Sequence, residues 1–370
     1  MTAMKMIRAT ASVLLAALVL GACSDDGPTF PTSFEPIELQ NDLGVASAAA
    51  NAPAAASFAV LGIDIETALL NAGGGAALML EAPALLIEGP LTPTAELQAR
   101  VERQLVARRT DVQMADALPA EVLGTTFVWD VSTSQYIASD ATGAPANGVR
   151  FALYAINPLT DLPAEPLNEI GHVDITVTGG GDNATVRVQV WSEGVSATRV
   201  LDYSAHMEAS QSSASVEIAG YAKNAQDSLA FTLSTGTTID MDAVTIDWRT
   251  SLPSRGLVTR LIETLSIGEV SQFTIDAAIV SPSGRVDLDG TITDFEGGTL
   301  AVKVNGQPFA TMTLSSSEDV EPVILNANNE PLTAEEEETL EQIFDWFSDA
   351  IEVFITLLAP VGVMLEPAVT

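Results

Sequence analysis

The side chain with the most distinctive chemistry is the thiol of Cys23, because the 370-residue chain contains a single cysteine. It follows an apolar run, Ala9 to Ala22, which in turn follows the basic residues Lys5 and Arg8. A run of about fourteen residues is too short for a membrane span, which needs roughly twenty in helix. The alternative is a free cysteine buried in an ordinary N-terminal helix. The charge, length and small residues before the thiol favour a secretory signal peptide.

The sequence Leu20-Gly21-Ala22-Cys23 resembles the lipobox of bacterial lipoproteins. The resemblance implies cleavage by signal peptidase II between Ala22 and Cys23 and acylation of Cys23. Two or more acyl chains give stable anchoring to a membrane. The residue after the cysteine is Ser24 rather than aspartate, which resembles outer-membrane sorting in the lipoproteins of diderm bacteria. We therefore expect an outer-membrane lipid anchor with a periplasmic or surface-exposed domain, the membrane being bound through the acyl chains on Cys23.

The remaining residue patterns predict no catalytic site. His172 and His206 lie in strand-like runs, without a second ligand at the spacing of a metal site. The chain has no Gly-x-Ser-x-Gly elbow, Walker loop or His-Glu-x-x-His motif. We expect a protein that is not an enzyme and uses no cofactor.

Two acidic patterns are alternatives for calcium binding. Asp240 with Asp242, and Asp287 with Asp289, place carboxylates on the same side of a strand, and Asn326 to Glu337 superficially matches an EF-hand loop. That loop has Pro331 where an EF-hand requires glycine. A solvated acidic face and an ordinary loop are the favoured interpretation, so we expect no metal.

The charge of the chain limits its partners. The sequence has 15 Lys and Arg residues against 49 Asp and Glu residues, for a formal net charge of −34. Nucleic-acid binding requires cations that neutralise phosphates, so we exclude it. The residues are 47% hydrophobic but only 5% aromatic, and this composition argues for a folded acidic protein rather than a disordered tail.

Five segments follow from the composition. Residues 1–22 are the signal peptide, and residues 23–36, with three prolines, are a lipidated tether. Residues 37–123 are an Ala-rich segment with one or two short helices before residue 91 and a clearer helix over residues 95–109. Residues 124–326 form a β domain, and residues 327–370 hold a C-terminal helix that packs on it.

Short alternating apolar and polar runs fill the β segment. Val286, Leu288 and Ile292 alternate with polar residues, which predicts one apolar and one solvated face. Asn305-Gly306 indicates a two-residue type I′ hairpin, and Ser281–Gly284 and Gly179–Asp182 are further turn signals. About a dozen strands joined by short turns predict an antiparallel meander. The Pro- and Gly-rich loops between Ser139 and Asp174 either form a functional rim or cover a sheet edge.

The C-terminal segment predicts a long amphipathic helix that ends at Pro360. Thr333 and Glu336 form a capping box at its start. One apolar stripe is predicted to pack on the sheet or to contact an apolar ligand: Leu340, Ile343, Phe344, Phe347, Ile351, Phe354 and Leu358.

Together these elements predict an α+β fold, in which a large curved antiparallel sheet carries the C-terminal helix and N-terminal helices on one face. This layout resembles the half-barrel lipoprotein carriers of the LolA, LolB and LppX type in architecture alone. The resemblance implies an apolar ligand held between sheet and helices. The alternative is a structural or assembly protein of the envelope that binds a protein partner through sheet edges and loops.

Overall fold

The computed structural model describes residues 36–60, 118 and 120–362, apart from short gaps at 181–182, 194–196, 211–212, 239–242, 267–269, 294–296 and 316–321. The chain divides into two compact units, Met1–Phe30 and Pro31–Thr370, and every described residue belongs to the second. Cys23 and the lipobox, the segment 61–91 and the helix predicted over residues 95–109 lie outside the described residues.

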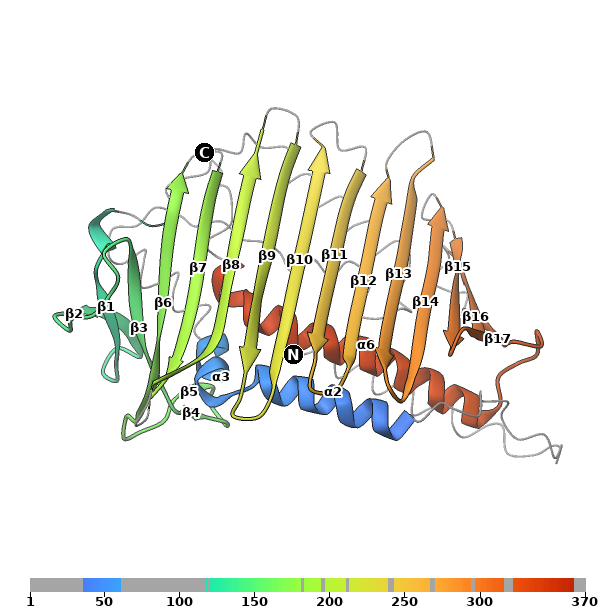
Figure 1. The fold of residues 1–370 in the computed structure, drawn as a ribbon, viewed down its shortest axis with the longest axis horizontal. Coiled ribbons are helices and arrows are strands. Elements are labelled where there is room, and N and C mark those ends of the chain that lie inside the picture. Colours follow the sequence, from blue (N-terminus) through green and yellow to red (C-terminus); the bar gives the residue numbers. More distant parts are fainter. Residues whose placement is uncertain are drawn as a thin grey trace. The chain divides into compact units, whose positions relative to one another are not determined.

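A single fifteen-stranded sheet dominates the described residues (Figure 1). From edge to edge its order is β17-β16-β15-β14-β13-β12-β11-β10-β9-β8-β7-β6-β3-β1-β2. Its strands are β1 (Thr126–Asp130), β2 (Gln135–Ser139), β3 (Gly148–Tyr154), β6 (Glu169–Gly180), β7 (Asn183–Ser192), β8 (Thr198–Ala209), β9 (Ser213–Lys223), β10 (Ser228–Thr238), β11 (Ala243–Leu252), β12 (Leu257–Ser266), β13 (Gln272–Ser281), β14 (Gly284–Thr293), β15 (Gly297–Val304), β16 (Gln307–Ser315) and β17 (Val323–Asn326).

The sheet is mixed, which corrects the prediction of a purely antiparallel one. From β6 to β17 each strand pairs antiparallel with the next, as a meander requires. At the other edge β1 pairs with β3 in parallel, because β2 occupies the far side of β1 and the chain must cross back before β3 begins. The α+β class with one large sheet is confirmed.

The sheet has fifteen strands where about a dozen were predicted, and β2, β8, β12 and β17 are not among the runs that gave the prediction. In β12, Leu257, Leu261 and Leu265 are buried, and Val258 and Arg260 between them face the other side of the sheet. This alternation has the two-residue period of a strand. The segment Ser139 to Asp174 also contains a small separate hairpin, formed by β4 (Ile156–Asn157) and β5 (Leu162–Pro163).

The two-residue turns form where the sequence predicts them. Val304 pairs with Gln307 across the turn, and Asn305 and Gly306 have φ angles of 50° and 77°. Positive φ at both central residues is the type I′ geometry. Ser281 pairs with Gly284 across the second predicted turn, whereas residues 181–182 of the third lie outside the described residues.

Two short helices precede the sheet in the chain. Helix α2 (Pro36–Ala50) and helix α3 (Pro53–Val60) are separated at the predicted break near Pro53. Helix α2 begins at Pro36, the last residue of the predicted tether. Helix α2 contacts β9 and β10, and α3 contacts β3, β6, β7 and β8. The buried hydroxyl of Ser57 donates a hydrogen bond to the carbonyl oxygen of Tyr154 at 2.9 Å, which attaches α3 to β3.

The C-terminal helix α6 (Ala334–Gly362) crosses the strands on the same side as α2 and α3 and contacts both of these helices (Figure 1). It continues two residues beyond Pro360, so the predicted end is wrong by less than one turn. The predicted capping box is present. The backbone N–H of Thr333 donates to Glu336 Oε2 at 2.8 Å, and the backbone N–H of Glu336 donates to Thr333 Oγ1 at 3.3 Å.

Loss of this cap gives a first testable prediction. Thr333→Ala is expected to lower the free energy of unfolding by about 1 kcal/mol, since it leaves a helix N–H without its acceptor. Equilibrium unfolding in urea measures the change. Thr333→Ser keeps the hydroxyl and is the matched control, expected to remain close to wild type. Equal losses in both variants would contradict a role for the hydroxyl.

Candidate functional site: an apolar pocket between the sheet and helix α6

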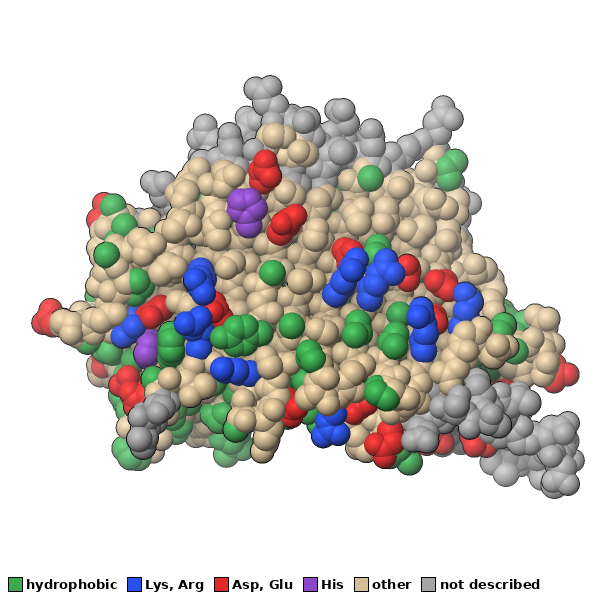
Figure 2. Space-filling view, in the orientation of Figure 1, with side chains coloured by type: hydrophobic (Ala, Val, Ile, Leu, Met, Phe, Trp, Pro, Cys, Tyr) green, Lys and Arg blue, Asp and Glu red, His purple; other side chains and the backbone are tan. Residues whose placement is uncertain are grey.

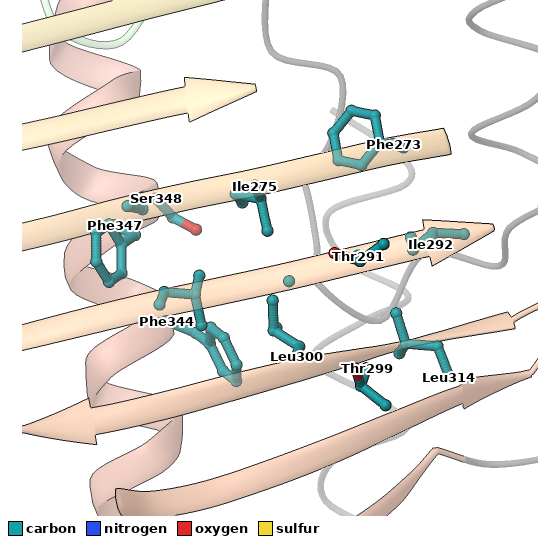
Figure 3. A pocket seen from close by; sticks show the side chains of 13 residues that line it. Phe273, Ile275, Thr291, Ile292, Thr299, Leu300, Leu314, Phe344, Phe347 and Ser348 are labelled. Atoms are coloured by element: carbon teal, nitrogen blue, oxygen red, sulfur yellow. The ribbon is translucent and has the colours of Figure 1, made fainter. Parts of the chain in front are cut away.

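A pocket lies between helix α6 and one end of the sheet (Figure 3). Thirteen residues from four strands and the helix line it: Phe273, Ile275, Ala277, Leu288, Gly290, Thr291, Ile292, Thr299, Leu300, Leu314, Phe344, Phe347 and Ser348. No charged side chain belongs to this set, and its polar members are two threonines and one serine. The pocket can therefore contact hydrocarbon but offers no counterion to a charged group.

The cavity is small as it stands. Its volume is about 40 Å³, whereas pockets for drug-sized ligands have volumes of roughly 300–1,000 Å³. Water enters a cavity of this size only if polar groups bind it, and apolar cavities stay dry. The space accommodates a few carbon atoms, so a longer chain could enter only if α6 moved away from the strands.

The predicted helix stripe divides into two sets. Leu340, Ile343, Phe347 and Ile351 are buried, and Phe344 and Leu358 are partly buried. The side chain of Phe354 lies outside the described residues. Of these seven residues, Phe344 and Phe347 line the pocket. The structure thus brings the middle of the stripe to the pocket, and the other described members are packing residues.

Two residues of this region were missed by the sequence analysis. Trp346 is buried on α6, next to the predicted stripe. Gly290 lies in β14 on the floor of the pocket, where a Cβ atom would come within 2.5 Å of Leu300 Cδ1 and 2.7 Å of Ile275 Cγ2. A glycine inside a strand pattern is a recognised signal of such close approach.

The opposite face of the sheet is charged (Figure 2). We call it the open face, since α2, α3 and α6 lie on the other side in Figure 1. Ion pairs cross it from β3 to β15: Arg150–Asp174, Arg187–Asp202, Arg199–Asp202, Arg249–Asp247, Arg260–Asp276, Arg285–Asp287 and Lys303–Asp289. Four of these pairs join neighbouring strands, so register determines them, whereas Arg199–Asp202, Arg249–Asp247 and Arg285–Asp287 each lie within one strand.

Asp202 is the carboxylate with the most partners on the open face. It accepts hydrogen bonds from Arg187 Nε and Nη2, both at 3.0 Å, and also from Arg199 Nη1. Burial by itself would raise the pKa of Asp202, but the hydrogen bonds from Arg187 and Arg199 lower it more, so that the pKa is below its ordinary value. Asp202 therefore remains ionised and fixes the positions of both guanidinium groups.

The two histidines do not meet. His172 stacks on Trp191, with ring centroids 6.2 Å apart, and burial followed by the charge of Arg150 lowers its pKa. His206 Nδ1 is 3.1 Å from Thr185 Oγ1. Their cross-strand partners in β7, Trp191 and Thr185, are six residues apart, which is roughly 20 Å along a strand.

The acidic patterns form no metal centre in the described residues. Within the part of the chain that the structure describes, no group of three or more His, Cys, Asp or Glu side chains could hold a metal ion. Asp287 and Asp289 pair with Arg285 and Lys303, while Asp240 and Asp242 lie outside the described residues. In the EF-hand-like loop, Asn326 Oδ1 accepts the backbone N–H groups of Asn328 and Glu330.

Among the described helices, none is by itself both long and apolar enough to cross a membrane. The pair Ile37–Ala50 and Pro53–Val60, bent by 71°, satisfies the test of length and composition when taken together.

The fold and the pocket define a class: an α+β protein in which helices cover one face of a single large open sheet and the other face is charged. Comparisons with protein-family models, with curated proteins and with solved structures find no match to this chain.

Proposed function

We propose that this chain is an exported, non-enzymatic lipoprotein of the cell envelope, anchored through acyl chains on Cys23. The support is the order of the N-terminal features: basic residues, an apolar run too short to span a bilayer, small residues, and then the single cysteine. The residue Ser24 after the cysteine supports an outer-membrane location.

The folded part of the protein then binds the end of an apolar, lipid-like chain between α6 and the sheet. The observation that carries this proposal is the pocket lining, in which Phe273, Ile275, Leu300, Phe344 and Phe347 surround a cavity with no charged side chain. Burying apolar surface stabilises a complex by about 25 cal/mol per Å². A charged headgroup would have no partner there and would stay in solvent.

Helix α6 is the movable cover of this site in the proposal. The cavity of about 40 Å³ is too small for a lipid chain, so the chain must separate Phe344 and Phe347 from the strands that face them. The energy for this movement comes from the apolar contacts that the ligand makes in their place. Binding then exchanges helix–sheet contacts for ligand contacts.

A substitution that fills the pocket tests this proposal. Ala277 is buried in β13 and lines the cavity, so Ala277→Leu places three more carbon atoms in it. We expect the affinity for a fluorescent long-chain fatty acid to fall at least about tenfold, which corresponds to 1.4 kcal/mol. Titration followed by fluorescence measures it, and lipid extraction with mass spectrometry identifies the ligand that co-purifies with the wild type.

The matched control is Ala310→Leu. Ala310 is also a buried alanine, in β16, but it does not line the pocket. Both variants overpack the interior and lose similar stability, about 1–3 kcal/mol. Equal affinities in the two variants, or a wild-type protein that carries no lipid and binds no fatty acid, would show that the pocket is only a packing defect.

The small cavity favours a second candidate, an envelope assembly protein that binds a protein partner through sheet edges and loops. In that case the interior is simply a core, and the partner contacts strands such as β17, where Val323 is exposed. Crosslinking in cells followed by mass spectrometry distinguishes the two candidates. A protein crosslink at β17 together with a lipid-free interior would support the second.

A further inference from the structure

Glu263 in β12 is the most deeply buried acidic side chain in the described part of the chain, with 1% of its surface exposed. Three other acidic side chains are buried there, each held by groups on the described elements: Asp42 by Arg255, Asp202 by two arginines, and Glu336 by the cap of α6. Glu263 also takes part in a polar or electrostatic interaction. A carboxylate removed from water needs such an interaction, because its lost hydration must be compensated.

Glu263 points to the helix side of the sheet, which is the face that carries α2, α3 and α6. The alternate residues Leu261, Glu263 and Leu265 of β12 are all buried, so they share this face. The cross-strand neighbours of Glu263 are Ile246 in β11 and Ile275 in β13, and Ile275 lines the pocket (Figure 3). Glu263 therefore places a carboxylate within an apolar surface, directly beside the pocket.

The nine Lys and Arg residues of the described chain lie elsewhere. Seven form the ion pairs of the open face, and Lys223 lies over the ring of Tyr221, the cross-strand neighbour of Asp202 on that face. The ninth, Arg255, is in the turn before β12, about 20 Å along the strand from Glu263. The described helices α2, α3 and α6 contain neither Lys nor Arg.

The remaining basic residues of the chain are concentrated in one segment. The sequence has six of them outside the described residues: Lys5 and Arg8 before the cysteine, and Arg100, Arg103, Arg108 and Arg109 within the helix predicted over residues 95–109. After removal of the proposed signal peptide, this segment holds all the cations that are not already placed on the described elements.

The spacing within this segment selects one of the four arginines. Leu97, Val101 and Leu105 recur every four residues and form the apolar stripe of the predicted helix. Arg108 follows Leu105 by three residues, so it continues the same stripe. Arg103 falls on the opposite side of the helix, two residues from Val101 and from Leu105. A surface that receives the stripe therefore also receives the guanidinium group of Arg108.

The chain is long enough to bring Arg108 to β12. The 3-10 helix η1 (Ala120–Val122) begins eleven residues after Arg109 and lies next to β3, where the N–H of Gly124 donates to the carbonyl oxygen of Gly148 at 2.8 Å. Eleven extended residues span about 36–40 Å. The seven strand intervals from β12 to β3 measure about 34 Å. On the other side, Ala95 is 35 residues after Val60 at the end of α3, so that connection sets no limit.

We propose that residues 95–109 bind the helix side of the sheet through their apolar stripe, and that Arg108 forms an ion pair with Glu263. The apolar residues of the stripe then contact the surface around Ile246 and Ile275, and the segment borders the pocket. Breaking a buried pair by removing one partner is strongly destabilising, because the other charge stays buried without compensation. The proposal depends neither on acylation of Cys23 nor on a bound lipid.

Hydrogen exchange of the full chain, read by mass spectrometry on the amides of residues 95–109, tests the proposal. In the wild type these amides are expected to exchange at least a hundredfold more slowly than in urea-unfolded protein, since an isolated helix of this length is marginal in water. Glu263→Gln and Arg108→Gln should each accelerate the exchange at least tenfold. The double variant should exchange no faster than either single variant, because all three lose the same pair.

Arg103→Gln is the matched control, because it removes the same charge from the opposite side of the predicted helix, and it should exchange like the wild type. Arg108→Lys keeps the charge and should retain most of the protection. The amides of β6 to β11 in the same spectra show whether each variant is folded, and Arg108→Gln, which changes no described residue, remains the test if Glu263→Gln unfolds.

Three results would overturn the proposal. Exchange of the wild-type segment at the unfolded rate would exclude the docking. Equal acceleration in Arg103→Gln and Arg108→Gln, or effects of Glu263→Gln and Arg108→Gln that add in the double variant, would exclude the pair. Protection that appears only at protein concentrations where copies associate would assign the surface to the segment of a second copy instead.

Discussion

Phe347→Ala is expected to lower the free energy of unfolding by about 3–5 kcal/mol, the usual cost of removing a buried phenylalanine side chain. Phe347 is 2% exposed on α6 and contributes to the pocket between the helix and the sheet. The cost has two parts, namely the lost burial of the ring and the enlarged cavity that remains. Equilibrium unfolding in denaturant measures the change.

Phe344→Ala is the matched control, because Phe344 lines the same pocket from the next turn of α6 but is only partly buried. Its loss of stability should be clearly smaller. Fatty-acid binding, unlike stability, should change in both variants, because both rings contact the ligand in the proposed site. If Phe347→Ala were as stable as the wild type, α6 would not be packed on the sheet as described.

Cys23→Ser is expected to abolish incorporation of radiolabelled palmitate, the second large effect. The thiol is the proposed acceptor of the acyl chains, and a serine hydroxyl does not replace it. Stable membrane attachment needs two or more lipid signals. The variant has no acyl chain, so it should also be absent from the outer-membrane fraction. Labelling in cells and mass spectrometry of the N-terminal peptide measure both results.

Ser24→Ala serves as the control for Cys23→Ser, since it changes the neighbouring residue but keeps the thiol and the preceding Leu20-Gly21-Ala22. It should be labelled like the wild type. Label retained by Cys23→Ser would show that the acyl chains are attached elsewhere, and an unlabelled wild type would contradict the lipoprotein proposal while leaving the pocket untouched.

The parts of the fold that could be predicted are those determined by local sequence. Asn305-Gly306 specifies its own turn because both residues tolerate positive φ, and Thr333 with Glu336 specifies its own cap. The strand β12 was missed because Leu257, Leu261 and Leu265 repeat every four residues, a spacing that fits a helix as well as a strand. The parallel pairing of β1 with β3 depends on where the chain returns to the sheet, which no local pattern encodes.

Only the helix side of the candidate site could be predicted from the sequence. The stripe on α6 identified Phe344 and Phe347, since helical periodicity gives the apolar side of a helix directly. The other half, including Ile275, Gly290 and Leu300, depends on which strands the helix crosses. The charged open face was missed for a similar reason. Each strand shows a polar side in its alternation, but the register that brings Arg187 in β7 to Asp202 in β8 arises only when the strands pair.

The contacts of α6 with α2 and α3 also determine the order in which this protein can assemble. From β6 to β17 each strand pairs with its neighbour in the chain, so the sheet can grow strand by strand in chain order. Helix α6 is the last described element, and it joins the two ends of the described chain by contacting helices that were made first. Until α6 arrives, the apolar side chains of β13 to β15 that line the pocket lack their helical cover. A chain whose α6 has not yet formed therefore exposes this apolar surface, and exposed apolar surface makes a folding intermediate prone to aggregation.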